Sequence, residues 1–211
     1  MYRYFYLLKY SHEMKRMLSV EEKAFHHLVK ISKHHIPLSD VIKQNGILSI
    51  PKSEFKIFDY MSRIIIKQQL SNKVAEVIWN RLAEHSDHDL LKFVKIENKE
   101  AILKCGLSNR KYEAILRLKK EHETNDLSTL HSHDIDEVKD YINSLYGFGE
   151  WSSAMICLFF FQDHDTWSHH DATLNKASKL LEIDQKLIDQ ASPYKSFLAL
   201  HLWKAVDSKM I

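Results

Sequence analysis

Glycine and proline are scarce in this chain, which has four and three of them among 211 residues. An all-β protein needs many turns, so this scarcity argues against a fold built on sheets. Only two cysteines, Cys105 and Cys157, are present. They exclude a four-cysteine zinc or iron–sulfur site and provide no disulfide framework. No apolar run is long enough to span a membrane, and the N-terminus lacks the pattern of a signal peptide. We therefore expect an intracellular protein, in a bacterial cytoplasm or a nucleus, without a membrane partner.

The charges are also nearly balanced, because 30 lysines and arginines oppose 28 acidic residues. A formal charge of +2 neither requires nor excludes a nucleic-acid partner, since a local basic patch can act on a nearly neutral protein. The 14 histidines are scattered, several of them as adjacent pairs such as His26-His27 and His169-His170. Adjacent helical residues point about 100° apart and rarely chelate one ion together. We expect surface histidines and no metal site.

Most of the chain has apolar residues at the helical period, for example over residues 54–67 and 72–84. We predict an all-α protein, in one compact unit or two helical lobes. Residues 150–162 are apolar nearly all round, as in a central buried helix. The polar stretch 121–133 is expected to be a loop. Ser192-Pro193 is expected to begin the last helix, with the serine as N-cap and the proline as its first residue.

The segment "LYGFGEWSSAM" places Gly147 and Gly149, half of the glycines, one residue apart between two predicted helices. Both are expected to supply positive φ angles and to leave backbone N–H groups uncovered. Beside the positive end of a helix, those groups would form a site for an anion such as a DNA phosphate. The alternative is a glycine-rich turn without any ligand.

Four segments, in the same order, resemble the helix-hairpin-helix DNA glycosylase superfamily. The hairpin with Trp151 is followed, 22 positions after Gly149, by Asp171 in "HHDATLNKA". The other three are "FDYMSRIIIKQQLSNKVAEVIWNRL" from Phe58, "CGLSNRKYEAILRL" from Cys105 and "SPYKSFLALHLWKA" from Ser192. The resemblance implies two helical lobes with a cleft between them and no iron–sulfur cluster. We take residues 51–211 as the glycosylase domain and residues 1–50 as an N-terminal helical segment packing on it, without the extra β domain of larger members.

The resemblance also implies a reaction. Asp171 would be the catalytic carboxylate, stabilising positive charge on the sugar and orienting or deprotonating the attacking water. Lyase members have a lysine nucleophile where this chain has Trp151, and an indole cannot form a Schiff base. Tryptophan at this position is what the alkylation-repair branch, 3-methyladenine DNA glycosylase II, shows. We therefore expect a monofunctional glycosylase that excises alkylated bases from duplex DNA in base excision repair.

Further roles follow from the same resemblance. Trp151 and Trp167 are candidates to stack on a flipped base, although either could instead pack in the core. Gln69 and Leu70 are candidates for the wedge that fills the gap in the duplex, with Gln68 facing inward; the alternative is packing within the protein. Gly147, Phe148 and Gly149 would bind a DNA phosphate. We expect a monomer whose partner is double-stranded DNA with damaged bases, and no cofactor, with a monovalent cation at the hairpin backbone as the alternative.

The sequence departs from the family pattern in two places. Tyr146 replaces the proline of the hairpin, and Ser168, His169 and His170 stand before Asp171, where members have a proline and often a second acidic residue. A different lesion specificity therefore stays open. So does a non-catalytic DNA-binding protein, although such a protein does not need Asp171. A third alternative is a bifunctional lyase that uses Lys176.

Overall fold

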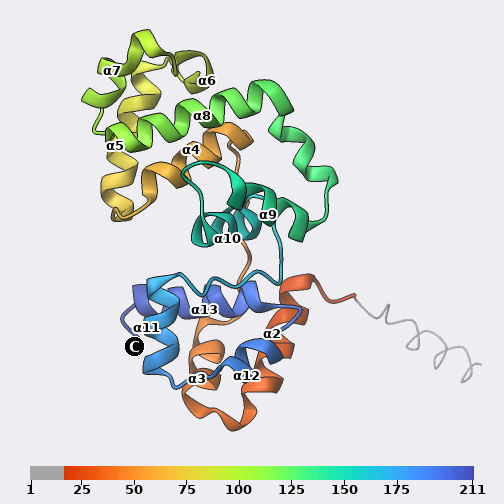
Figure 1. Cartoon of the computed structure of the whole chain (residues 1–211). Helices are drawn as coiled ribbons and strands as arrows, with labels where there is room; N and C mark the ends of the chain where they lie inside the picture. Colours follow the sequence, from red (N-terminus) through yellow and green to blue (C-terminus); the bar gives the residue numbers. More distant parts are fainter. Residues whose placement is uncertain (1–16) are drawn as a thin grey trace, which may run out of the picture.

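A computed structural model describes residues 17–211, and this part of the chain contains helices and no strand. The helices form two groups, one above the other in Figure 1. The upper group, here the hairpin lobe, contains α4 (Ile57–Lys67), α5 (Asn72–His85), α6 (Leu90–Phe93), α7 (Lys99–Lys104), α8 (Asn109–Asn125), α9 (Ile135–Ser144) and α10 (Glu150–Phe159). The lower group, here the terminal lobe, contains α2 (Val20–Ile31), α3 (Ile36–Asn45), α11 (Ala172–Leu180), α12 (Gln185–Gln190) and α13 (Lys195–Asp207). Three short 3₁₀ segments complete the order: η1 (Ser32–His34), η2 (Ile96–Asn98) and η3 (Leu127–Ser132).

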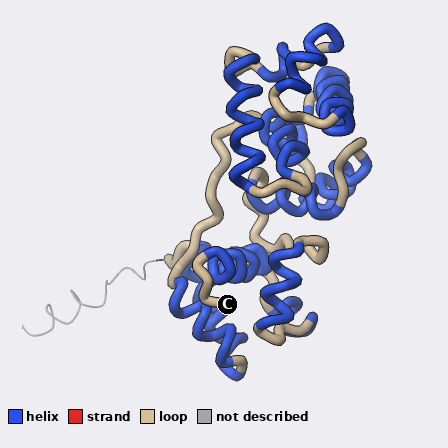
Figure 2. Tube along the Cα trace, turned by 90° about the vertical axis from the view of Figure 1, so that its left-hand side faces the viewer, coloured by secondary structure: helices blue, strands red, loops and turns tan. Residues whose placement is uncertain are grey.

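Each lobe has its own hydrophobic core. The core of the terminal lobe joins residues from both ends of the chain, since Leu28 and Ile42 belong to the same cluster as Leu174 and Leu202. The chain crosses between the lobes twice, around residues 46–56 and again around residues 160–171 (Figure 2). Within the described residues, the N-terminal helices α2 and α3 thus pack beside α13. The proposed domain boundary at residues 50–51 stays a prediction.

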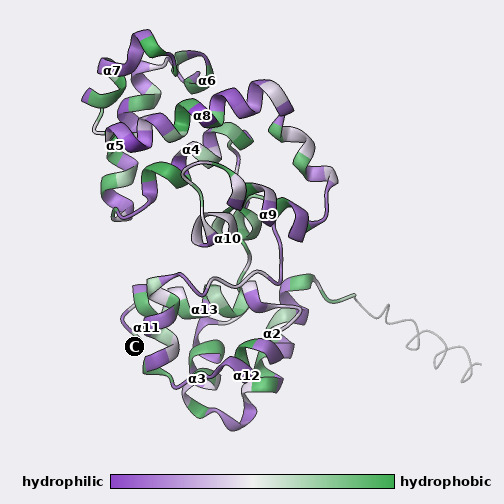
Figure 3. Ribbon diagram, in the orientation of Figure 1, coloured by the Kyte–Doolittle hydropathy of each residue, from purple (hydrophilic) through white to green (hydrophobic). Residues whose placement is uncertain are grey.

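Individual helices have apolar and polar sides, as Figure 3 shows for α2 and α11. The exception is α10, in which every residue from Ser152 to Leu158 is buried. This confirms the expected central helix. It packs against α9 and α4, so it anchors the hairpin that precedes it to the middle of the hairpin lobe. None of the helices within residues 17–211 is both long and apolar enough to cross a membrane.

The structure corrects two expectations about helix ends. Helix α8 runs on to Asn125 and η3 follows it, so residues 121–133 are largely helical rather than a loop. Leu127 and Leu130 are buried there, which explains why this polar stretch is ordered. The last helix begins at Lys195 after a cis Ser192–Pro193 bond, so neither Ser192 nor Pro193 caps or begins it. The N-cap of this helix is Tyr194.

Candidate active site

Asp171 is the N-cap of α11, and only 8% of its surface is exposed. Its Oδ1 atom accepts hydrogen bonds from the backbone N–H of Leu174, at 2.8 Å, and from Nε1 of Trp203, at 3.1 Å. Its Oδ2 atom accepts a hydrogen bond from Nε1 of Trp151, at 2.9 Å. Both carboxylate oxygens are therefore held in place by neutral N–H donors.

The three donors come from different parts of the fold. Trp151 is the second residue of α10, Leu174 lies in α11, and Trp203 lies in α13. The carboxylate is thus fixed where the hairpin lobe meets the terminal lobe. Within residues 17–211 no basic side chain forms an ion pair with it. A carboxylate that is oriented in advance and not neutralised can stabilise positive charge that develops close to it.

Trp203 was missed as a site residue in the sequence analysis. It stands in the segment "SPYKSFLALHLWKA", but nothing in the helical period of that segment shows which way the indole points. The signal that could have found it is chemical. The N–H of a partly buried indole needs an acceptor, and Asp171 is the one buried carboxylate of the described chain.

The two tryptophans predicted to stack on a base lie in different surroundings. The indole of Trp151 is half-buried and its orientation is set by the hydrogen bond to Asp171. Trp167 is half-buried too, but it packs against the core of the terminal lobe. A stacking role for either residue stays a prediction, and the contact with Asp171 distinguishes Trp151.

The hairpin between α9 and α10 has one glycine in a left-handed conformation rather than two. Gly147 has φ +90°, and a Cβ atom there would lie 2.6 Å from Cβ of Ala114. Gly149 has φ −160°, and nothing lies within 4 Å of the position of its Cβ, so the positive φ expected for Gly149 is wrong. Gly149 is the N-cap of α10 and provides no side-chain cap. The backbone N–H groups in the first turn of α10 are therefore free of a side-chain cap and suited to bind an anion.

The turn after α4 contains the predicted wedge residues. Gln69 is exposed and has φ +58°, while Leu70 is half-buried against the core of the hairpin lobe. Gln68 faces inward, as expected: its Nε2 donates to the carbonyl oxygen of Gly147 at 2.8 Å and to Oγ of Ser152 at 2.9 Å. This side chain therefore links the wedge turn to the hairpin. Of the two wedge candidates, Gln69 is the one that the structure places outward.

Lys111, which the sequence analysis did not single out, supports the same turn. Its Nζ donates to the carbonyl oxygens of Ile66 and Gln68, each at 2.7 Å. Burial of the ammonium group lowers the pKa of Lys111. Because the last carbonyls of a helix lack partners within it, Lys111 satisfies the end of α4 and fixes where the wedge turn begins.

Replacing Lys111 by methionine should lower the free energy of unfolding by about 2 kcal/mol, since two carbonyl oxygens lose their donor. Urea unfolding followed by circular dichroism measures this loss. Arg110→Met is the matched control, because Arg110 is the exposed neighbour and its loss removes the same charge. Equal unfolding midpoints for the two variants would contradict the supporting role of Lys111.

An ion pair lies at the edge of the site. His170 Nδ1 lies 2.7 Å from Oε2 of Glu150, and both side chains are mostly exposed. It joins the residue after Gly149 to the residue before Asp171, so the histidine that departs from the family pattern contacts the hairpin lobe. An exposed pair of this kind contributes at most about 1 kcal/mol to stability.

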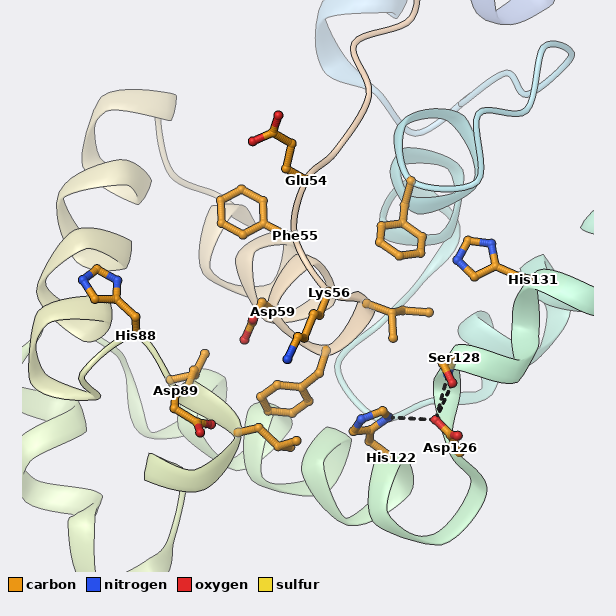
Figure 4. Close-up of a pocket in the computed structure, with 15 residues that line it drawn as sticks. Glu54, Phe55, Lys56, Asp59, His88, Asp89, His122, Asp126, Ser128 and His131 are labelled. Carbon is orange, nitrogen blue, oxygen red and sulfur yellow. Dashed lines mark hydrogen bonds and ion pairs between the residues drawn. The ribbon is translucent and has the colours of Figure 1, made fainter.

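A cavity of about 750 Å³ lies elsewhere in the described chain. Figure 4 shows its lining, which includes Lys56, Asp59 and His122, and the contacts of Asp126 with His122 and Ser128. Phe160, which follows α10, also lines it, whereas Trp151 lies at the start of that helix. A helix of 10 residues is about 15 Å long, so this cavity is separate from Asp171. The residues described also contain no group of three or more histidine, cysteine, aspartate or glutamate side chains that could hold a metal ion.

No model of a known protein family matches the sequence, and no curated protein matches it. Solved structures do match. A DNA-3-methyladenine glycosidase from Bacillus halodurans is 25% identical, with a TM-score of 0.69 over 85% of this chain and 88% of that one. The Schizosaccharomyces pombe 3-methyladenine DNA glycosylase, solved with abasic DNA, is 18% identical, with a TM-score of 0.77 over 88% and 97%. The 3-methyladenine DNA glycosylase from Archaeoglobus fulgidus is 20% identical, with a TM-score of 0.67 over 85% and 69%.

Proposed function

We propose that this chain, which has the fold of the helix-hairpin-helix DNA glycosylase superfamily, is a DNA glycosylase that excises alkylated bases, 3-methyladenine among them, from duplex DNA. The observation that carries the proposal is the carboxylate of Asp171, held by Trp151 and Trp203 where the two lobes meet. The hairpin supports it, because the uncapped N-terminus of α10 provides N–H groups for a DNA phosphate close to that carboxylate.

In the proposed reaction, the damaged base leaves the stack and Gln69 enters the gap. The bond from C1′ of the sugar to the base nitrogen breaks, and its electron pair leaves with the base. An alkylated base that carries positive charge becomes neutral in this step, so no strong general acid is needed. Asp171 stabilises the cationic sugar, water adds to C1′, and the proton of that water passes to the carboxylate or to solvent. The products are the free base and an abasic site.

This reaction needs no cofactor, since water and the carboxylate provide the chemistry. A monovalent cation bound by the hairpin backbone remains the alternative. Two of the hairpin carbonyls, those of Leu145 and Gly147, already accept hydrogen bonds from Phe148 N and Gln68 Nε2. Each carbonyl oxygen has a second lone pair, so the backbone is able to coordinate such an ion.

The proposed enzyme is monofunctional. Trp151 provides an N–H donor and no amine, and that donor is engaged by Asp171. Lys176, the alternative nucleophile, is exposed and lies five residues after Asp171. Side chains five apart on a helix point about 140° apart, so Lys176 does not share the face of the carboxylate. We further propose that the protein acts on DNA as a monomer, within the bacterial cytoplasm or a nucleus.

The test is to incubate the protein with methylated duplex DNA and to identify released bases by chromatography. We expect release of 3-methyladenine, an abasic strand that breaks only after alkali, and no protein–DNA adduct after borohydride reduction. An adduct trapped by borohydride would show that a lysine reaches C1′ and would contradict the monofunctional mechanism. DNA binding without release of any alkylated base would instead favour the non-catalytic DNA-binding alternative.

A further inference from the structure

A cavity of about 510 Å³ lies beside the hairpin, between its turn and α8. The turn contributes Leu145, Tyr146 and Phe148 to the lining, and α8 contributes two exposed basic residues, Arg117 and Lys120. Tyr146 is the residue that stands where the family hairpin has a proline, and 46% of its surface is exposed. This cavity therefore includes a feature that belongs to this chain rather than to the family pattern.

Arg117 is held in place by two contacts. Its guanidinium carbon lies 4.2 Å from the centre of the Tyr146 ring, which is a cation–π distance. Its Nε donates to Oε1 of Glu113 at 2.8 Å. The side chain is nevertheless 57% exposed, and its two terminal nitrogens form no hydrogen bond to any other residue of the described chain. A fixed guanidinium with free terminal N–H groups is suited to bind a phosphate through two parallel hydrogen bonds.

The cavity residues of α8 continue a series of contacts that this helix makes with the wedge turn and the hairpin; Figure 1 shows the course of the helix. Near the start of this helix, Lys111 contacts the wedge turn, and one turn later Ala114 contacts Gly147 of the hairpin. Arg117 and Lys120 lie three and six residues further on, which is about 4.5 and 9 Å along the helix axis. Successive nucleotides of a duplex strand advance by about 3.4 Å. A strand that passes the wedge and the hairpin therefore reaches the cavity within a few nucleotides.

Acidic residues limit the positive charge of the cavity. Glu121, which lines it, accepts hydrogen bonds from the hydroxyl group of Tyr141 and from Nδ2 of Asn125, and these contacts lower the pKa of its carboxyl group. Its carboxylate is thus engaged by neutral donors on its own side. The lining contains two positive side chains and one negative side chain, and Glu113 forms an ion pair with Nε of Arg117 beside it. The two terminal nitrogens of Arg117 and the ammonium group of Lys120 are the groups left to bind a phosphate, which suits a single phosphate group rather than a highly charged ligand.

We propose that Arg117, held against the ring of Tyr146, and Lys120 bind a second phosphate of the DNA strand whose first phosphate is bound by the hairpin. The inference rests on the proposed function, because it places DNA on the hairpin. It assigns a role to Tyr146: the ring replaces the rigidity of a proline by a platform that positions Arg117. The hairpin and α8 of this chain together therefore contact two phosphates along the strand.

The salt dependence of DNA binding tests this inference. Each phosphate contact contributes about 0.9 to the slope of log affinity against log salt concentration. We expect Arg117→Gln to reduce the slope by about 0.9 and to weaken binding of a labelled duplex about five- to tenfold, measured by fluorescence anisotropy at several salt concentrations. Tyr146→Phe should retain the wild-type slope, whereas Tyr146→Ala should reduce it as Arg117→Gln does, since the platform is lost.

Lys186→Gln is the matched control, because Lys186 is an exposed residue of α12 in the other lobe and its loss removes the same charge. If Arg117→Gln and Lys186→Gln gave the same slope, the inference would be overturned. Base release is measured in parallel for every variant. If the wild-type protein released no base, but Arg117→Gln reduced the salt-dependence slope, the glycosylase function would be contradicted and the phosphate contact supported. If the wild-type protein released base, but Arg117→Gln left the slope unchanged, the glycosylase function would be supported and the phosphate contact contradicted.

Discussion

Replacing Asp171 by asparagine should reduce base release at least about 100-fold while DNA binding is retained. Asparagine preserves size and caps helices well, so α11 should still begin at the same residue. It removes the negative charge that is proposed to stabilise the sugar cation. It also replaces one oxygen by an amide N–H₂ group, which would then face an indole N–H of Trp151 or Trp203. Single-turnover release of 3-methyladenine, at protein in excess over DNA, measures the effect.

Asp184→Asn is the matched control for this experiment. Asp184 is also the N-cap of a helix in the terminal lobe, and it accepts a hydrogen bond from the N–H of Leu187 at 2.8 Å. The same chemical change there should leave base release near the wild-type rate. Undiminished release by Asp171→Asn would show that another group stabilises the sugar, and the proposed role of Asp171 would be wrong.

The second large effect is expected at Gly147. Alanine at this position must adopt φ +90° and place its Cβ 2.6 Å from Cβ of Ala114. The strained backbone and the clash should each destabilise the hairpin by about 1–3 kcal/mol. Because the hairpin is proposed to bind phosphate, affinity should fall about tenfold or more for damaged and undamaged duplexes alike. Anisotropy titrations and thermal unfolding measure the two effects.

The variant Gly149→Ala tests whether the requirement for glycine is specific to position 147. Its backbone is extended and its Cβ would meet no atom within 4 Å, so the unfolding temperature should not change. The double variant Gly147→Ala with Ala114→Gly should recover part of the lost stability, since it removes the clash but not the strained φ. A Gly147→Ala protein with wild-type stability and affinity would show that the turn accepts a side chain at this position.

The helices of this fold could be predicted from the sequence because their apolar residues recur at the helical period. Serine and aspartate stand at several of the starts, where Ser108 and Asp171 are N-caps. The predictions that were wrong concern local features of the chain. Residues 121–133 lack a strong period because only Leu127 and Leu130 of η3 are buried. The proline of Ser192-Pro193 indicated a helix start two residues too early, since the helix begins at Lys195 with Tyr194 as its N-cap.

The site was predicted only as far as order along the chain allows. The spacing from Gly149 indicated Asp171 as the candidate carboxylate, and the resemblance to the family placed Gln68 inward, where it contacts the hairpin. Trp203 and Lys111 were missed, because their partners lie 32 residues away and about 45 residues away, in other helices. Which glycine is left-handed was also beyond the sequence, since that depends on Ala114 of α8 packing against Gly147 but not against Gly149.

The way the chain crosses between its lobes has a consequence for its synthesis. The hairpin lobe is continuous, from α4 to α10, and is complete while the last helices are still being made. The terminal lobe needs α2 and α3 from the beginning of the chain and α13 from its end, and α13 also brings Trp203 to Asp171. A nascent or prematurely terminated chain thus has its hairpin before its carboxylate is fixed. The order of translation therefore makes the proposed DNA-binding hairpin appear earlier than the proposed site of base release.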